Sequence, residues 1–250
     1  MRVVDLSADV GEEAADPADE RALLDTVTSA SVSCGAHAGT PEGVAATVEA
    51  AVAAGAALGA HPSYPDRDGF GRRVVEMSDR ALATSLSEQL AFVAGLAAAH
   101  GARLRYVKPH GALYHRTSND AAVARLVASV VADAGIGVLL LGAGAATAGI
   151  LHDGGLEVVG EAFADRAYCA DGSLVPREQR GAVLQEEAAV VDQALSIVLS
   201  GRVRVAGGQE IEVDAASLCL HGDTPAALQL ARSVRMALEA EGVALAPFVP

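Results

Sequence analysis

One lysine and a set of histidines and carboxylates are the side chains in this sequence best suited to chemistry. The eighteen lysine and arginine residues comprise seventeen arginines and Lys108 alone, so surface charge here does not depend on lysine. A lysine ammonium is compact, carries three donors and has a pKa that burial can lower. Lys108 ends an apolar run and precedes a loop that contains His110. We therefore interpret Lys108 as a residue retained for chemistry.

Six polar motifs lie at the carboxyl ends of short apolar runs that are predicted to be strands. The runs are residues 3–6, 31–34, 57–60, 104–107, 138–141, 157–160 and 218–220, and segments with helical spacing separate them. Strand–helix alternation along the whole length predicts a parallel sheet with crossover helices. The side chains of interest in the six motifs are Asp9, Glu12, His37, His61, Tyr64, Lys108, His110, Asp165, Arg166, His221 and Asp223.

The placement of these motifs favours a closed barrel over an open sheet. In a closed parallel barrel all carboxyl strand ends share one rim, so the motifs would converge on one mouth. An open, doubly wound sheet would spread them along a line, and only the motifs at its switch point could form a binding site. No linker, low-complexity tract or charge block divides the 250 residues. We therefore predict a single α/β-barrel domain over residues 1–250.

Three local patterns add detail to this expectation. Helix starts are predicted at Thr40, at Ser78 and at Thr224, the first and last of these followed by proline. Residues 203–205 and 211–213 flank two glycines as in a hairpin, and residues 165–180 are predicted to be a long irregular excursion. The glycine-rich residues 141–147, with Glu161 further on, loosely imitate a dinucleotide fingerprint, but a tight turn explains them better.

Two chemistries fit the rim residues, and the sequence leaves both open. One is metal-assisted hydrolysis, in which Asp9 and two or three of His37, His61 and His110 hold a divalent ion that activates water. The other is metal-free acid–base catalysis, in which an acidic residue activates water while Lys108 or a histidine stabilises developing negative charge. No two histidines have the spacing of a helical metal motif, so metal ligands would have to come from separate strands.

The remaining candidates have a structural reading beside the functional one. Arg166 could clamp a substrate carboxylate through two parallel hydrogen bonds, or form an ion pair with Asp165 that braces a loop. His100 and His152 lie at predicted helix C-termini, where a cation favours the helix dipole, and are expected to be structural. His115 is expected to face solvent.

Composition excludes several classes of partner. A net charge of −14 argues against a nucleic-acid surface or an anionic membrane surface, because both need clustered lysine and arginine. The three cysteines are widely spaced and contain no C-x-x-C pair, so neither disulfides nor a thiolate zinc site is indicated. No run resembles a signal peptide or an uninterrupted membrane span. The sequence thus predicts a cytoplasmic protein with a small-molecule substrate.

The six motifs together resemble those of the LamB/YcsF family, the A subunits of 5-oxoprolinase. The resemblance runs essentially from end to end and is carried, in order, by residues 5–12, 34–39, 59–66, 107–114, 163–166 and 221–225. It implies a distorted seven-stranded parallel β/α barrel related to the glycoside hydrolase/deacetylase superfamily. It also implies ATP-dependent opening of 5-oxo-L-proline to L-glutamate, together with partner subunits B and C.

This resemblance suggests roles for the rim residues. The chain has no G-x-x-x-x-G-K-[ST] loop, so phosphorylation by ATP is expected to depend largely on the partners. Asp9 or Glu12 would position water, while Lys108 and His110 would meet the oxyanion. A divalent metal remains open, with Asp9, His37, His61 and His110 as candidate ligands. The predicted substrate-binding residues are His37, His61, Tyr64, Asp165, Arg166, His221 and Asp223.

Two other functions are compatible with the same residues. A stand-alone, divalent-metal-dependent deacetylase or amidohydrolase would need neither ATP nor partners. A non-catalytic subunit that binds substrate or acts as a scaffold would tolerate loss of Asp9 or Lys108. The sequence also departs from the family pattern, with Ser7, Ala36, Thr40 and His115 where Asn, Phe, Asp and Asn are usual. The first two departures fall in candidate site motifs.

Overall fold

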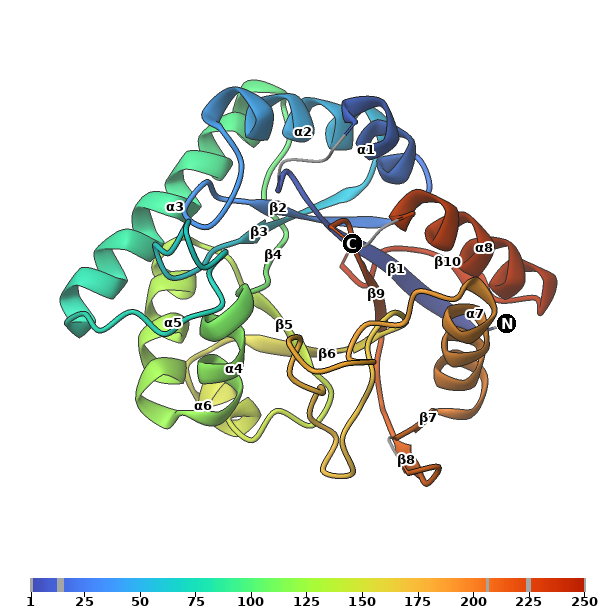
Figure 1. Cartoon of the computed structure of the whole chain (residues 1–250). Helices are drawn as coiled ribbons and strands as arrows, with labels where there is room; N and C mark the ends of the chain where they lie inside the picture. The colour runs from blue at the N-terminus through green and yellow to red at the C-terminus, as the bar shows by residue number, and fades with distance from the viewer. Residues whose placement is uncertain (1, 13–15, 206, 224–225, 250) are drawn as a thin grey trace.

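Helices surround a closed ring of parallel strands in the computed structural model (Figure 1). The structure describes residues 2–12, 16–205, 207–223 and 226–249. Within them the sheet order is β1-β2-β3-β4-β5-β6-β9, and β9 pairs with β1 to close the ring. The predicted closed parallel barrel of seven strands is therefore confirmed. Its strands are β1 (Val3–Val10), β2 (Ser29–Ser33), β3 (Ala57–His61), β4 (Tyr106–Val107), β5 (Val138–Gly142), β6 (Glu157–Phe163) and β9 (Ser217–His221).

Three further strands lie outside this ring. β10 (Ala244–Leu245) pairs in parallel with the first residues of β1. β7 (Arg202–Arg204) and β8 (Glu210–Glu212) form an antiparallel pair, which confirms the predicted hairpin. The expected irregular excursion is also present, since only isolated bridges hold the chain between β6 and the next helix.

Helices form the outer layer of the barrel, and several of them begin at a side-chain cap. Thr40 and Ser78 each accept a backbone N–H in the first turn of the helix that follows, as predicted. The predicted start at Thr224 lies outside the described residues. The helices are α1 (Pro17–Leu24), α2 (Pro41–Ala54), α3 (Asp79–Ala99), α4 (Gly111–Asn119), α5 (Ala121–Asp133), α6 (Ala148–Asp153), α7 (Glu187–Leu195) with the π-turn η1 (Ser196–Ser200), and α8 (Ala227–Ala240).

The helix α3 is long and apolar enough, by length and composition, to cross a membrane. In this fold it belongs to the outer layer of the barrel, where it contacts α2 and α5. Leu86, Leu90, Val93 and Ala97 form its buried stripe. The apolar side chains of this stripe thus pack between α3 and the rest of the barrel.

Alternating side chains of β1 explain why the strand continues beyond its predicted end at Leu6. Leu6, Ala8 and Val10 belong to the apolar core between sheet and helices. Asp5 instead accepts hydrogen bonds from Ser29 and Ser217 on the two neighbouring strands, which places it inside the barrel. Because the period is two, Asp9 shares this inner face. The polar residues on the inner face made the second half of β1 look like a loop in the sequence. In the structure the strand continues through them to Val10, at the rim of the barrel.

A glycine in β3 makes room for the ring of Tyr106 on β4. Tyr106 is fully buried, and its hydroxyl lies 3.1 Å from Ser31 Oγ. A Cβ on Gly59 would lie 2.2 Å from the Tyr106 ring, well inside van der Waals contact. The absence of a side chain at position 59 is therefore what allows β3 and β4 to pair at this point.

We expect Gly59→Ala to destabilise the fold by more than about 2 kcal/mol, because overpacking forces ring or backbone to move. The matched control is Gly95→Ala in α3, where a Cβ meets nothing within 4 Å. There the same substitution should raise stability by about 0.5–1 kcal/mol through helix propensity. Urea unfolding of both variants measures the difference, and equal stabilities would contradict the role given to Gly59.

Candidate active site

Lys108 lies inside the carboxyl end of the barrel and is the centre of a buried charged group. It directly follows β4, and only 2% of the residue is exposed. Its Nζ donates to Asp9 Oδ1 and Oδ2 at 2.8 and 3.1 Å, and lies 3.0 Å from Glu161 Oε2. Cys219 Sγ is 3.1 Å away. One ammonium thus joins carboxylates from β1 and β6 across the barrel.

The surroundings of Lys108 keep it charged. Burial alone would lower the pKa of Lys108, but Asp9, with Cys219 and Glu161, raises it well above its ordinary value. Burial raises the pKa of Asp9, but the Lys108 ammonium beside it outweighs this effect and holds that pKa well below the usual range. Lys108 therefore acts as a fixed cation, and the neutral amine that burial would favour is not formed at neutral pH.

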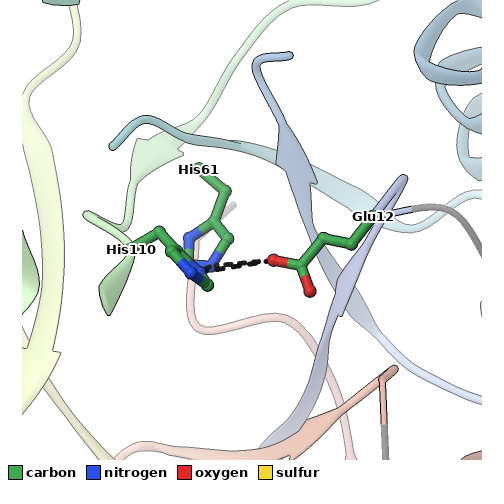
Figure 2. A group of neighbouring side chains, drawn as sticks. All are labelled: Glu12, His61 and His110. Atoms are coloured by element: carbon green, nitrogen blue, oxygen red, sulfur yellow. Dashed lines mark hydrogen bonds and ion pairs between the residues drawn. The ribbon is translucent and has the colours of Figure 1, made fainter. Parts of the chain in front are cut away.

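A cluster of three histidines surrounds Glu12 beside this ion pair. Glu12 Oε1 lies 2.9 Å from His37 Nε2, 3.3 Å from His110 Nδ1 and 3.7 Å from His61 Nε2. The His37 and His110 rings stack at 3.9 Å, and His61 stands edge-on to both. Figure 2 shows Glu12, His61 and His110 pointing toward one another from different parts of the barrel. The cluster meets the ion pair where Asp9 Oδ2 lies 3.5 Å from His61 Nε2.

Burial sets the protonation of this cluster. It lowers the pKa of His37 and His110 to about 4 and that of His61 well below the ordinary value, so all three rings are neutral at neutral pH. It raises the pKa of Glu12 to about 7, and the negative charges of Asp9 and Asp223 add to this effect. Glu12 is thus surrounded by three imidazoles that are neutral at neutral pH.

One group of donor atoms among the described residues is compact enough to hold a metal ion, and it shares His61 and His110 with the predicted ligands. Donor atoms of Glu12, His61 and His110 all lie within 4.8 Å of one another. The carboxylate of Asp9 is engaged by Lys108, and His37 lies outside this group of three. Glu12 thus joins His61 and His110 in this group, and the predicted roles of Asp9 and His37 as ligands stay predictions.

The opposite wall of the site is built from β6, β9 and the excursion between β6 and α7. His221 Nδ1 lies 2.9 Å from Asp165 Oδ1, and the His221 ring stacks on Phe163 at 5.3 Å. Arg166 donates to the backbone carbonyls of Val175 and Ala182 at 2.7 and 3.1 Å. Two Arg166 donors thus hold the excursion together from within, so the side chain braces this loop through backbone carbonyls.

Two arginines that the sequence analysis did not single out reach the mouth of the site. Arg72 and Arg177 come from loops 105 positions apart, yet both donate to the carboxylate of Asp223, at 2.8 and 2.7 Å. Neither follows a strand directly, so the strand-end rule could not find them. Together with the buried Arg166 they bring three arginines to the cavity lining.

A cavity of about 380 Å³ lies between these walls. Of the predicted residues, Asp9, His61, Lys108, His110, Arg166 and His221 line it. His115, expected at the surface, is exposed and also lines the cavity. Glu12 and His37 lie directly behind, in contact with His110. The other lining residues are Arg72, Pro109, Gly111, Ala112, Tyr114, Phe163, Leu174, Val175, Pro176, Arg177 and Glu178.

The structure does not bring every predicted residue to this cavity. The ring of Tyr64 packs within the apolar core and is not part of the cavity lining. Asp165 bonds to His221, and Asp223 bonds to Arg72 and Arg177, so these two carboxylates hold residues of the cavity lining in place. Ser7, a departure from the family pattern, is fully buried and bonds to Ser217 at 3.0 Å in the barrel interior. Glu161 was missed as a site residue, although its position at the end of β6 was visible in the sequence.

The fold and this site define a class of protein: a closed parallel β/α barrel with a buried lysine–carboxylate group and a histidine cluster at its carboxyl rim. The peptidoglycan deacetylase PdaC from Bacillus subtilis shares this fold at a TM-score of 0.51, with 11% identity over 98% of this chain and 87% of that one. At that identity the likeness shows the architecture alone.

Comparison with closer sequences identifies the family. The model of the LamB/YcsF family matches residues 4–250, and the chain belongs to this family. It is 45% identical over 249 residues to a Paracidovorax citrulli protein named as the A subunit of 5-oxoprolinase, covering 98% of this chain and 99% of that one. A lactam utilization protein from Thermus thermophilus superposes with a TM-score of 0.90 at 37% identity, covering 99% of this chain and 100% of that one.

The buried group around Lys108 leads to a prediction about stability. Removing one partner of a buried ion pair leaves an uncompensated charge, which costs about 3–5 kcal/mol. In the wild type the lowered pKa of Asp9 means that its contribution is complete above its ordinary pKa and is lost as the pH falls. In Lys108→Met the orphaned carboxylate has a raised pKa, so it costs stability as the pH rises past about 4. The deficit of Lys108→Met should therefore widen between about pH 4 and about pH 7.

Urea unfolding at the two pH values measures this deficit. The double variant Asp9→Asn/Lys108→Met is the matched control, because it removes the cation and one carboxylate together and should lose less than the sum of the single variants. A deficit of Lys108→Met that is the same at both pH values would show that the charge of Asp9 does not depend on Lys108.

Proposed function

We propose that this chain is the A subunit of an ATP-dependent 5-oxoprolinase that opens 5-oxo-L-proline to L-glutamate together with subunits B and C. The observation that carries the proposal is the cavity itself, in which the fixed Lys108 cation and Asp9 lie at the floor and arginines surround the mouth. Such a cavity suits a small ring that bears a carboxylate. The names of the relatives supply the particular substrate, since one is a lactam utilization protein and another belongs to a 5-oxoprolinase.

Ring opening of a five-membered lactam needs activation. The amide is a stable, weakly electrophilic group, and the open form recloses readily, so coupling to ATP favours hydrolysis. Transfer of the γ-phosphoryl group to the amide oxygen releases ADP and makes the ring carbon electrophilic. Water then adds to that carbon, the ring C–N bond breaks, and the nitrogen leaves as an amine after taking up a proton. A second water releases phosphate from the resulting acyl phosphate and gives glutamate.

The residues of the cavity floor are suited to the steps at the ring carbon. Lys108 presents a permanent positive charge in a water-poor site, where it stabilises an oxyanion or a phosphoryl oxygen far better than in water. Asp9 is held ionised beside it and accepts hydrogen bonds, so it can orient an attacking water. Glu161 fixes Lys108 from the other side at 3.0 Å. The pair thus combines charge stabilisation with water positioning.

The rim is suited to hold the substrate carboxylate. In a chain of net charge −14, three arginines around one cavity form a local exception. Asp223 already binds two of these arginines with a carboxylate, which shows that Arg72 and Arg177 meet in the geometry that such a group needs. Guanidinium groups bind carboxylates in defined, often paired hydrogen bonds. A substrate carboxylate would share or replace these contacts.

Phosphorylation by ATP is assigned to the partner subunits because this chain has no recognisable phosphate-binding loop. The chain holds no G-x-x-x-x-G-K-[ST] loop, and Lys108 is not at a glycine-rich helix start. The relatives are named as subunits, which supports a shared enzyme. We therefore assign phosphorylation mainly to partners B and C, and ring opening of the activated intermediate to this barrel.

The central test combines this chain with purified B and C subunits and follows ATP-dependent glutamate release. Lys108→Met should lower kcat by at least about 100-fold, because an electrostatic group at the reacting atoms is removed. His100→Gln, at the exposed C-cap of α3, is the matched control and should keep wild-type turnover. The three candidate functions give different results in this assay.

Turnover by Lys108→Met near the wild-type rate, with the complex intact, would indicate a non-catalytic scaffold and overturn the proposal. Amide or acetyl hydrolysis by the chain alone, without ATP, B or C, would indicate the stand-alone hydrolase instead. Loss of turnover with the complex still assembled on a sizing column supports the proposed role. Assembly must be measured alongside, since Lys108→Met is also expected to reduce stability.

Substrate binding at the rim gives a separate kinetic prediction. Arg177→Gln should raise KM for 5-oxo-L-proline about tenfold or more, since a hydrogen bond to a charged group contributes about 1.5–3 kcal/mol. Because the carboxylate is remote from the reacting carbon, kcat should change little. Arg204→Gln on the exposed hairpin is the control and should leave KM unchanged. A fall in kcat without a change in KM would contradict carboxylate binding at Arg177.

A further inference from the structure

Two histidines of the cluster have their protons fixed by groups that only accept hydrogen bonds. His61 Nδ1 lies 2.7 Å from the backbone carbonyl of Lys108, so the proton of the neutral ring resides on Nδ1. His61 Nε2 then carries a lone pair. His110 Nε2 lies 2.9 Å from the carbonyl of Phe70, which places its proton on Nε2 and a lone pair on Nδ1. A carbonyl has no proton to give, so neither tautomer can be reversed without losing a hydrogen bond.

The loop that supplies the second carbonyl is held in an unfavourable backbone conformation. Phe70 has a φ of 54°, although it is not glycine, and its ring packs edge-on against both His37 and His110. A Cβ on Gly71 would lie 2.9 Å from His110 Cδ2 and from His37 Cβ. The loop is therefore pressed against the histidines, and strain of this kind is found where the surroundings enforce a functional geometry.

The two lone pairs face each other and a carboxylate oxygen. His61 Nε2 and His110 Nδ1 are 3.0 Å apart, and Glu12 Oε1 lies 3.7 and 3.3 Å from them (Figure 2). Both ring protons point away to carbonyls, so the two rings present lone pairs to each other and to Glu12 in a buried place, and a cation at their centre would bind all three atoms and displace any proton that Glu12 holds. We propose that Glu12, His61 and His110 form a binding site for one divalent transition-metal ion.

His37 completes the arrangement as a positioning residue. Its Nε2 lies 2.9 Å from Glu12 Oε1, and its Nδ1 lies 2.9 Å from Ser63 Oγ, a hydroxyl that is also 2.9 Å from the Tyr64 carbonyl. When the single Ser63 proton turns from that carbonyl to His37 Nδ1, His37 carries its own proton on Nε2 and donates it to Glu12. Carboxylate ligands of metals are commonly held by such an outer hydrogen bond. The stacked His37 thus orients Glu12, while the Lys108 and Phe70 carbonyls orient the two ligand rings.

The donor set indicates which ions fit. Two imidazole nitrogens and one carboxylate oxygen suit Zn²⁺, Co²⁺ or Fe²⁺ better than Mg²⁺ or Ca²⁺, which prefer oxygen ligands alone. Three protein ligands leave room for a further ligand, as in catalytic metal sites. His61 and His110 also line the cavity, so that room faces the proposed substrate. An ion bound there would supply Lewis acidity at the cavity wall.

The experiment uses the purified full chain alone, so its outcome is independent of the 5-oxoprolinase assay. After treatment with a chelator, the chain is titrated with Co²⁺ and then Zn²⁺, and the metal content, calorimetric affinity and visible Co²⁺ spectrum are measured. We expect one ion per chain with micromolar or tighter affinity, and a Co²⁺ spectrum that shows nitrogen ligands and is replaced by Zn²⁺.

Matched variants define the ligands. His61→Asn and Glu12→Gln should each weaken binding by more than about 100-fold, whereas loss of the positioning residue in His37→Asn should weaken it about tenfold. His100→Gln, in the exposed C-cap of α3, should bind as the wild type does. Circular dichroism of the metal-free variants separates a lost ligand from a lost fold.

Three outcomes would overturn the proposal, and the first needs only the wild-type chain. Less than one ion per chain at millimolar Co²⁺ and Zn²⁺ would show that the two facing histidines share a proton and hold no metal. Binding that survives both His61→Asn and Glu12→Gln would place the ion elsewhere. Equal losses in His37→Asn and His61→Asn would make His37 a ligand and overturn its positioning role.

Discussion

The structure depends on how one positive charge is held inside the barrel. Lys108 is 2% exposed, and an isolated ammonium at that depth would either lose its proton or unfold the site. Carboxylates from β1 and β6 prevent both outcomes, because each lies about hydrogen-bond distance from Nζ. Since β1, β4 and β6 are far apart in the sequence, this group also fixes how the barrel closes around its centre. The contacts with Asp9 and Glu161 therefore both stabilise the buried ammonium of Lys108 and keep it positively charged.

A polar barrel interior follows from that arrangement. Parallel β/α barrels are usually filled by layers of branched apolar side chains. Here the inner face of β1 carries Asp5, Ser7 and Asp9, and the serines of neighbouring strands satisfy Asp5. Apolar stabilisation comes instead from the layer between sheet and helices, where the core side chains of every barrel strand gather. The interior thus serves as a polar scaffold beneath the site, and its small side chains leave space for Lys108.

The sequence predicted this fold because strand ends and helix caps are local signals, and because six polar motifs at strand ends require a common rim. It identified Lys108, Asp9, Glu12 and the rim histidines for the same reason. Arg72 and Arg177 were missed, since they lie in loops whose course depends on packing of the whole molecule. Tyr64 was placed at the cavity because it follows β3, but the chain turns its ring into the core. The side of a loop on which a residue lies is decided by tertiary contacts, which no local pattern contains.

The arginine rim and the buried lysine belong to one electrostatic design. A chain of net charge −14 repels small anions on average, so a path for an anionic substrate needs local positive charge. Arg72 and Arg177 provide it at the mouth, but unpaired guanidinium groups so close together would repel each other. The Asp223 carboxylate binds both arginines and so offsets the repulsion between their guanidinium groups. In the proposed function, a substrate carboxylate would share these bonds with Asp223 and lie above the buried Lys108.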